Sequence, residues 1–436
     1  MLQRSLAAVL LAALTAVTIP GCQRSGEEAG QGPTDAGGSV TLAPKGKVLE
    51  AAENEAPAGS ASAGRRAPAP PGPAHIDIPA GKLVAGSTPG DKGRDPTLEP
   101  ALLEVELGGY SIDRFLYPND PAKPPLTGVS RGRAAELCQQ AGGRLCTELE
   151  WERACKGPEM TPYAGGAAWD PECAKQPASC ASGFGALGMG ALREWTVSDV
   201  APIQGGGKAE KEGEKGEGEK GEKVEERPPA RAAAVRGGAP NAAAVDHRCA
   251  HRAGADPGAS SDNLGFRCCR GAPNAASIPA PEWLQTYRRA EISAAQIKEM
   301  IASVPHLAEI AGTEITFFKE PDDVKMALSR GDAGAAPPNT TLTTSPLLWN
   351  PVPGEEVLVV AGRADKHSFI LAFHRLPGDR YRIASSLLLR DEPGPVVLGF
   401  NGYIRRRLPW AICWDCRGES GNVTYRDDNR VVITQK

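Results

Sequence analysis

The stretch GGRLCTELEWERACKG, residues 142–157, decides how the surrounding chain folds. Thr147 is followed three residues later by Glu150, which is a capping box: the hydroxyl accepts the amide of the third helical residue, and the carboxylate accepts the amide of Thr147. The pattern predicts a helix that begins after Thr147, with Glu148 in the first turn, where the helix dipole favours negative charge. Glu148 and Glu152 lie four residues apart on one helical face. Two like charges on one face, without a metal partner, are more often solvent-exposed than catalytic, so we interpret this stretch as part of the structural framework.

The N-terminal residues, MLQRSLAAVLLAALTAVTIPGC, predict export. Arg4 precedes an apolar run that is too short for a membrane span of about 20 residues, so residues 1–21 are interpreted as a signal peptide. The Ile-Pro-Gly-Cys end resembles the lipobox of bacterial lipoproteins, which implies that Cys22 becomes the lipidated N-terminus. We therefore expect a lipid-anchored protein of the bacterial cell envelope, in the outer membrane or facing the periplasm. An ordinary secretory signal with an unrelated cysteine is the alternative.

Cysteine usage agrees with export. Ten cysteines follow Cys22, and an even number in an oxidising compartment favours disulfides. We predict the local pair Cys173–Cys180 and leave the partners of the other cysteines between residues 138 and 269 open. In CWDC, Cys413 and Cys416 are interpreted as a structural disulfide, because no thioredoxin-like pattern surrounds them. A zinc knuckle would need two more ligands.

Composition divides the chain into segments. Residues 22–74 are rich in Gly, Ala, Pro, Ser and Glu and predict a disordered tether. Residues 205–230, with alternating Lys, Glu and Gly, predict a disordered charged insert. The insert interrupts a predicted α+β domain, residues 75–270, with short apolar runs and much irregular backbone. Residues 283–436 predict a helix around EISAAQIKEMIASV followed by a β-rich domain, in which Leu376-Pro-Gly-Asp marks a turn.

The sequence lacks the motifs or the charge that several classes of enzyme and binding protein require. The net charge of −4 removes the electrostatic argument for nucleic-acid binding. The chain has no Gly-x-Ser-x-Gly elbow, Walker loop or His-Glu-x-x-His motif.

Ordered motifs carry a family resemblance. They are HIDIPAGKLVAGS, GGYSIDRFLYPND, VSRGRAAELCQQAGGRLCTELEWERACKG, GFGALGMGALREWTVSD, VRGGAPN and DNLGFRCC. Over about residues 76–269, the chain resembles the formylglycine-generating enzyme, or sulfatase-modifying factor, family. The resemblance implies a C-type-lectin-like fold with a surface cleft. Founding members oxidise a cysteine in Cys-x-Pro-x-Arg to formylglycine with oxygen and copper(I), which is held by two cysteines because a soft cation prefers soft sulfur ligands.

The chain departs from the family where the copper cysteines are expected. Residues 241–247 read NAAAVDH, and Cys249 resembles a structural cysteine further along. The segment GALREW, residues 190–195, also lacks the asparagine of the family's calcium site, and calcium needs six to eight oxygen ligands. We therefore predict a pseudoenzyme without a cofactor. Its candidate cleft residues are Asn241, Asp246, His247, Cys249 and His251, and its framework residues are Glu194, Trp195, Gly265, Phe266 and Arg267, with Arg267 paired internally.

The candidate cleft residues leave a second interpretation open. On a strand, His247, Cys249 and His251 would lie on one face and could contribute to a metal site. The favoured function is a binding or scaffold role for an unknown protein or envelope ligand. The alternative is an enzyme: a sulfatase-modifying oxidase that uses copper and calcium, or a member with different chemistry in the same cleft. A structural envelope protein that acts through its C-terminal domain is the third hypothesis.

Overall fold

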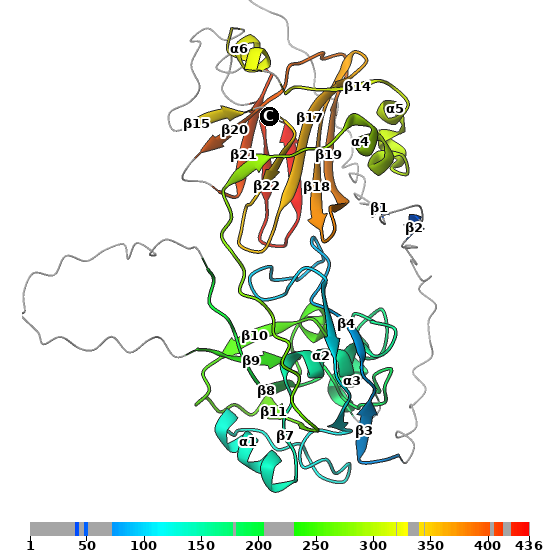
Figure 1. The fold of residues 1–436 in the computed structure, drawn as a ribbon, viewed down its shortest axis with the longest axis vertical. Coiled ribbons are helices and arrows are strands. Elements are labelled where there is room, and N and C mark those ends of the chain that lie inside the picture. Colours follow the sequence, from blue (N-terminus) through cyan, green and yellow to red (C-terminus); the bar gives the residue numbers. More distant parts are fainter. Residues whose placement is uncertain are drawn as a thin grey trace, which may run out of the picture. The chain divides into compact units, whose positions relative to one another are not determined.

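The computed structural model describes residues 40–42, 48–50, 72–177, 180–204, 231–319, 321–329, 340–343, 345–401, 405–412 and 420–435 (Figure 1). The predicted signal peptide with Cys22, the charged insert, and the pair Cys413 and Cys416 lie outside these residues. Within the predicted tether, β1 (Val40–Leu42) and β2 (Val48–Glu50) pair antiparallel, so this part departs from the expected lack of secondary structure. Val40, Thr41 and Val48 are β-branched, and β-branched residues favour strands. No helix within the described ranges is long and apolar enough to cross a membrane.

The predicted α+β class is confirmed, since 16% of the described residues are helical and 35% are in strands, with irregular backbone between the elements. Residues 72–270 contain three small sheets, ordered β10-β9-β8-β11, β3-β6-β12-β7 and β4-β5. β8 and β11 run parallel, and the other pairs are antiparallel. The strands are β3 (His75–Ile78), β4 (Gly81–Ala85), β5 (Leu103–Leu107), β6 (Tyr110–Asp113), β7 (Arg144–Leu145), β8 (Arg193–Asp199), β9 (Ala233–Arg236), β10 (Arg252–Ala255), β11 (Leu264–Phe266) and β12 (Cys268–Arg270). The helices are α1 (Arg131–Gln140), α2 (Glu148–Lys156), α3 (Glu172–Lys175) and the 3₁₀ helix η2 (Ala244–His247).

Helix α2 begins as its capping box predicts. The Thr147 hydroxyl accepts the Glu150 amide at 3.2 Å, and the Glu150 carboxylate accepts the Thr147 amide at 2.8 Å. The helix ends at Gly157, which adopts a φ of +68° that glycine tolerates best. All nine residues of α2 are buried, because the helix packs against β4, β8 and β9. The expectation that Glu148 and Glu152 are solvent-exposed is therefore wrong; they are 2% and 0% exposed.

Two disulfides join β12 to α1 and to the residue that follows β7. Adjacent residues of β12 bond in opposite directions, Cys268 to Cys138 of α1 and Cys269 to Cys146 beside β7. Successive strand residues point to opposite faces, so the two bonds lie in different hydrophobic clusters. The remaining bonds, also formed by described residues, are Cys155–Cys249 and the predicted local pair Cys173–Cys180.

Residues 283–436 form two antiparallel sheets with helices beside them. One sheet is ordered β13-β16-β17-β18-β19, with β14 also paired to β17, and the other is β15-β20-β21-β22-β23. The first sheet's strands are β13 (Tyr287–Arg289), β14 (Ile315–Phe317), β16 (Leu347–Trp349), β17 (Val357–Ala364), β18 (His367–Leu376) and β19 (Arg380–Leu389). The second contains β15 (Thr340–Thr343), β20 (Val397–Asn401), β21 (Arg407–Ala411), β22 (Gly421–Tyr425) and β23 (Val431–Gln435). The helical elements are α4 (Ala294–Ile301), η3 (Pro305–Leu307), α5 (Ala308–Ala311) and α6 (Pro321–Ser329).

Strand β17 is buried on both faces, which explains its continuous apolar sequence. Val357 and Val359 pack into the cluster shared with the second sheet, whereas Leu358 and Val360 pack with α4 and α5. The predicted helix is present as α4, and the predicted turn at Leu376 joins β18 to β19.

A buried ion pair joins the loop 86–100 to the C-terminal sheets. Arg94 pairs with Glu355, and both side chains are 0% exposed. His374 Nδ1 lies 2.8 Å from Glu355 Oε1. Burial acts to raise the pKa of Glu355, but Arg94 and His374 together hold that pKa below its usual value. The loop therefore belongs to the interior of the molecule at this point.

Candidate functional site

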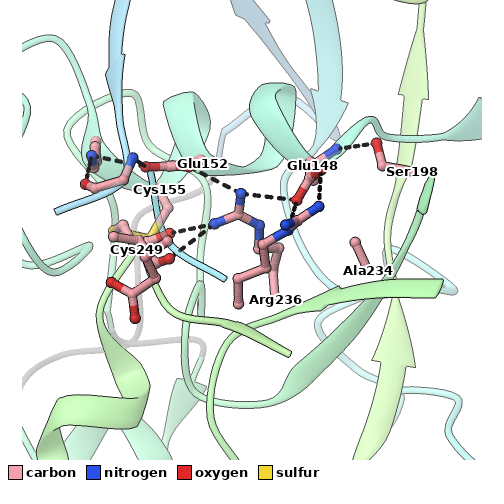
Figure 2. Close-up of polar contacts among 12 residues, drawn as sticks. Glu148, Glu152, Cys155, Ser198, Ala234, Arg236 and Cys249 are labelled. Atoms are coloured by element: carbon pink, nitrogen blue, oxygen red, sulfur yellow. Dashed lines mark hydrogen bonds and ion pairs between the residues drawn. A yellow bond between two sulfur atoms is a disulfide. The ribbon is translucent and has the colours of Figure 1, made fainter. Parts of the chain in front are cut away.

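The glutamates of α2 belong to a buried network of opposite charges (Figure 2). Arg236 of β9 places Nη2 3.2 Å from Glu148 Oε2 and 3.0 Å from Glu152 Oε2. Arg252 of β10 donates from Nε and Nη2 to the two oxygens of Glu148 at 2.6 and 2.8 Å. Figure 2 shows Arg236 between the two glutamates, with its other nitrogen directed at the backbone near Cys249.

Glu152 has its own cation. Its Oε1 lies 2.8 Å from Lys156 Nζ and accepts the Gly86 amide at 2.6 Å. Lys156 also donates to the carbonyl of Val84 at 2.6 Å. Because each carboxylate is already bound to two cations, the network fastens α2 to β4, β9 and β10. Such groups serve the fold and are poor candidates for proton transfer to a ligand.

The framework residues pair with one another. Arg267 donates from Nε and Nη2 to the carboxylate of Glu194 at 2.7 and 2.9 Å, as the predicted internal pairing requires. Gly265 and Phe266 lie opposite Glu194 and Trp195 in the parallel pairing of β11 with β8. The Trp195 indole N–H donates to the Val129 carbonyl at 2.9 Å.

Residues 241–251 do not form a strand, so the shared strand face considered for His247, Cys249 and His251 is absent. Residues 244–247 are the 3₁₀ helix η2, so His247, Cys249 and His251 do not alternate along a strand. Cys249 is bonded to Cys155 and offers no thiol. His247 is 1% exposed, its Nδ1 lies 2.8 Å from the Gly190 carbonyl, and its ring stacks on Trp169 at 4.0 Å.

The other candidate cleft residues lie nearer the surface. Asn241 is exposed, and Asp246 and His251 are half-buried. Burial lowers the pKa of His251, although the charges of Glu99 and Asp246 act in the opposite direction. His251 is therefore mainly neutral near pH 7.

A contact that the sequence did not indicate covers this segment. Arg248 binds both oxygens of Glu99 at 2.8 Å and donates to the Gly93 carbonyl at 2.5 Å. A Cβ atom on Gly93 would lie 2.5 Å from the Cβ of Val245. The loop 86–100 thus packs directly on residues 245–248. No local motif indicates Glu99 and Arg248, because 149 residues separate them.

A pocket of about 260 Å³ lies beside Trp169, the ring that stacks on His247. Its walls include Trp169, Asp170, Met189 and the Cys173–Cys180 disulfide. An Asp170 oxygen and the two sulfur atoms lie within 4.8 Å of one another. Both sulfurs are bonded to each other and cannot act as thiolates, so this trio is not a metal site. A larger pocket, about 430 Å³, lies in the C-terminal region near β13, β14 and α4.

The side chains present do not fit the family's metals. All eight cysteines of the described domain form disulfides, so the described residues supply no thiolate pair for copper(I). At the position of the family's calcium site, Ala191 has no side-chain oxygen. Both oxygens of Glu194 are bound by Arg267.

Together, these features define a disulfide-stabilised α+β domain whose buried charges serve the fold. Residues 105–272 match the family model "Sulfatase-modifying factor enzyme 1-like domain". A comparison with curated proteins finds no match. Similar solved structures include PvdO from Pseudomonas aeruginosa, with 19% identity over 45% of this chain and 94% of that chain, at a TM-score of 0.34. Treponema denticola variable protein 1 shows 16% identity over 45% and 94%, at a TM-score of 0.32.

Proposed function

We propose that this chain is a bacterial cell-envelope lipoprotein, anchored through Cys22, whose sulfatase-modifying-factor-like domain binds a partner and does not oxidise cysteine. The observation that carries the proposal is the state of the domain's cysteines. All eight are consumed in disulfides, and residues 241–247 contain none. Copper(I) chemistry of the family kind requires two thiolates in that segment, so the domain has no donor set for it.

The packing of the segment supports the same proposal. Val245 lies against Gly93, and Arg248 is bound to Glu99, so the loop 86–100 occupies one side of residues 245–248. His247 is buried under Trp169 and bonded to a backbone carbonyl. These contacts hold the segment in place, and the adjoining Cys249 is bonded to Cys155.

A binding role suits the remaining architecture. Disulfides and buried ion pairs make a rigid frame, and loops on a rigid frame are the usual carriers of binding sites. The predicted lipid anchor would place this frame at a membrane surface, where a protein or envelope ligand is the expected partner.

The test is an oxidation assay on a Cys-x-Pro-x-Arg peptide. The purified protein is incubated with the peptide, copper(I) and oxygen, and the peptide is analysed by mass spectrometry beside an authentic formylglycine-generating enzyme. We expect the peptide cysteine to remain a thiol while the control enzyme converts it to the aldehyde. Formation of formylglycine by this protein would refute the proposal.

A further inference from the structure

We propose that the pocket beside Trp169 binds a small organic cation, whose ammonium group is recognised by the indole ring and by the carboxylate of Asp170. The inference rests on the proposed binding function and adds the chemical class of the ligand. It starts from the charge of the walls. Among the described residues that line the pocket, Asp170 is the one ionisable side chain, and the others are Ala, Gly, Trp, Met and disulfide cysteines.

The aromatic wall is held in position before any ligand arrives. The ring of Trp169 stacks on His247 with 4.0 Å between centroids and 2° between planes, and Tyr163 lies at 6.3 Å on a tilt of 40°. His247 is fixed in turn by its contact with the Gly190 carbonyl. An indole ring is the best aromatic partner for a cation, and a ring that is already ordered loses little entropy on binding.

The carboxylate is also oriented. Asp170 Oδ1 accepts the amide of Glu172 at 3.0 Å, which positions the group at the start of α3. The same carboxylate lies within 4.8 Å of both sulfurs of the local disulfide, on the pocket wall. Met189 and the disulfide supply polarisable sulfur around the remaining volume. A positive charge in this pocket therefore meets one anion and several polarisable groups.

Other pockets of the described residues differ in charge. Each of three others contains both bases and acids: Arg289, Lys319 and Glu291 in the larger one near α4, Arg375 with Glu282, Glu355 and Glu356 beside the loop of β18 and β19, and Lys156 with Glu159 at the end of α2. The Trp169 pocket of about 260 Å³ is also smaller than the about 300–1,000 Å³ of sites for drug-sized ligands. Charge and size together favour a compact ammonium compound over an anion or a large ligand.

Calorimetric titration with choline tests the inference. The neutral control ligand is 3,3-dimethylbutan-1-ol, which has the shape of choline without its charge. We expect choline to bind at least about tenfold more tightly than the alcohol, since cation–π attraction and the carboxylate act only on the charged ligand. Asp170→Asn and Trp169→Leu should each weaken choline binding about tenfold. The matched control is Glu172→Gln, because Glu172 is an exposed acid paired with Lys175 at 2.7 Å and lies outside the pocket lining.

The outcomes separate the inference from the proposed function. Equal affinity for choline and the alcohol, no choline binding, or equal losses in Asp170→Asn and Glu172→Gln would each overturn the ammonium site. Thermal melting of each variant shows whether lost binding comes from unfolding, and the Asp170→Asn variant keeps the size of the side chain. None of these results alters the peptide oxidation assay, which tests the absence of oxidase activity independently.

Discussion

Replacing Glu148 by glutamine tests whether the buried charges of α2 are structural. Glu148 and Glu152 face three cations, Arg236, Arg252 and Lys156, so the cluster carries two negative and three positive charges. The substitution removes one negative charge and raises the surplus from one positive charge to two. Removing one partner of a buried ion pair costs about 3–5 kcal/mol, because the remaining charge stays desolvated. We expect Glu148→Gln to lower the free energy of unfolding by about this amount.

The assay is urea unfolding followed by tryptophan fluorescence, with Glu136→Gln as the matched control. Glu136 pairs with Arg133 at 2.9 Å on the exposed face of α1, with side-chain exposures of 61% and 51%. Exposed pairs of this kind contribute about 0–1 kcal/mol. The reasoning is refuted if Glu148→Gln unfolds within about 1 kcal/mol of the wild type. If the variant does not fold, the double variant Glu148→Gln/Arg252→Gln should recover part of the stability, since it removes both partners.

Three further predictions concern the stability that the disulfides provide, the loss of stability at low pH and the lipidation of Cys22. Replacing Cys138 and Cys268 together by alanine should cost about 2.5 kcal/mol, like removal of the local Cys173–Cys180 bond, because the intact Cys146–Cys269 bond already closes the long loop and leaves a ring of about ten residues; a loss of about 5 kcal/mol in urea unfolding would contradict this. The folded pKa of Glu355 lies below the unfolded value of 4.5, so its contribution to stability is present above pH 4.5 and is lost as the pH falls through the folded value. In Glu355→Gln, the free energy of unfolding should fall less steeply as the pH drops below 4.5. An unchanged pH dependence in this range would count against the buried ion pair. Cys22→Ser should abolish incorporation of labelled fatty acid and release the protein from the membrane fraction; retained label would disprove the lipobox interpretation.

Local patterns predicted those elements that neighbouring residues specify. The Thr147–Glu150 capping box placed the start of α2, because the bonds of a cap are made within one turn. The segment EISAAQIKEMIASV indicated the helix α4, and the structure buries its Ile297, Met300 and Ile301. The local disulfide Cys173–Cys180 followed from a short separation. Ordered motifs also indicated the family domain that the match at residues 105–272 supports.

The sequence did not predict how deeply these side chains are buried or which residues they contact. The helix spacing of Glu148 and Glu152 is compatible with a solvated face, but two of their three cations come from β9 and β10, 88 and 104 residues beyond Glu148. The alternation of His247, Cys249 and His251 suggested a strand, whereas the disulfide to Cys155 and the stack on Trp169 accompany a 3₁₀ turn.

Amino-acid order alone thus gave the class of domain, the helix starts and the lack of a cysteine pair in residues 241–247. Each of these depends on residue identity or on contacts within a few positions. Folding was needed to bring Arg248 to Glu99, Arg94 to Glu355, and His247 onto Trp169 beside the pocket. Such contacts depend on how distant segments pack, because a charge or a ring acquires its role from the groups that exclude water around it.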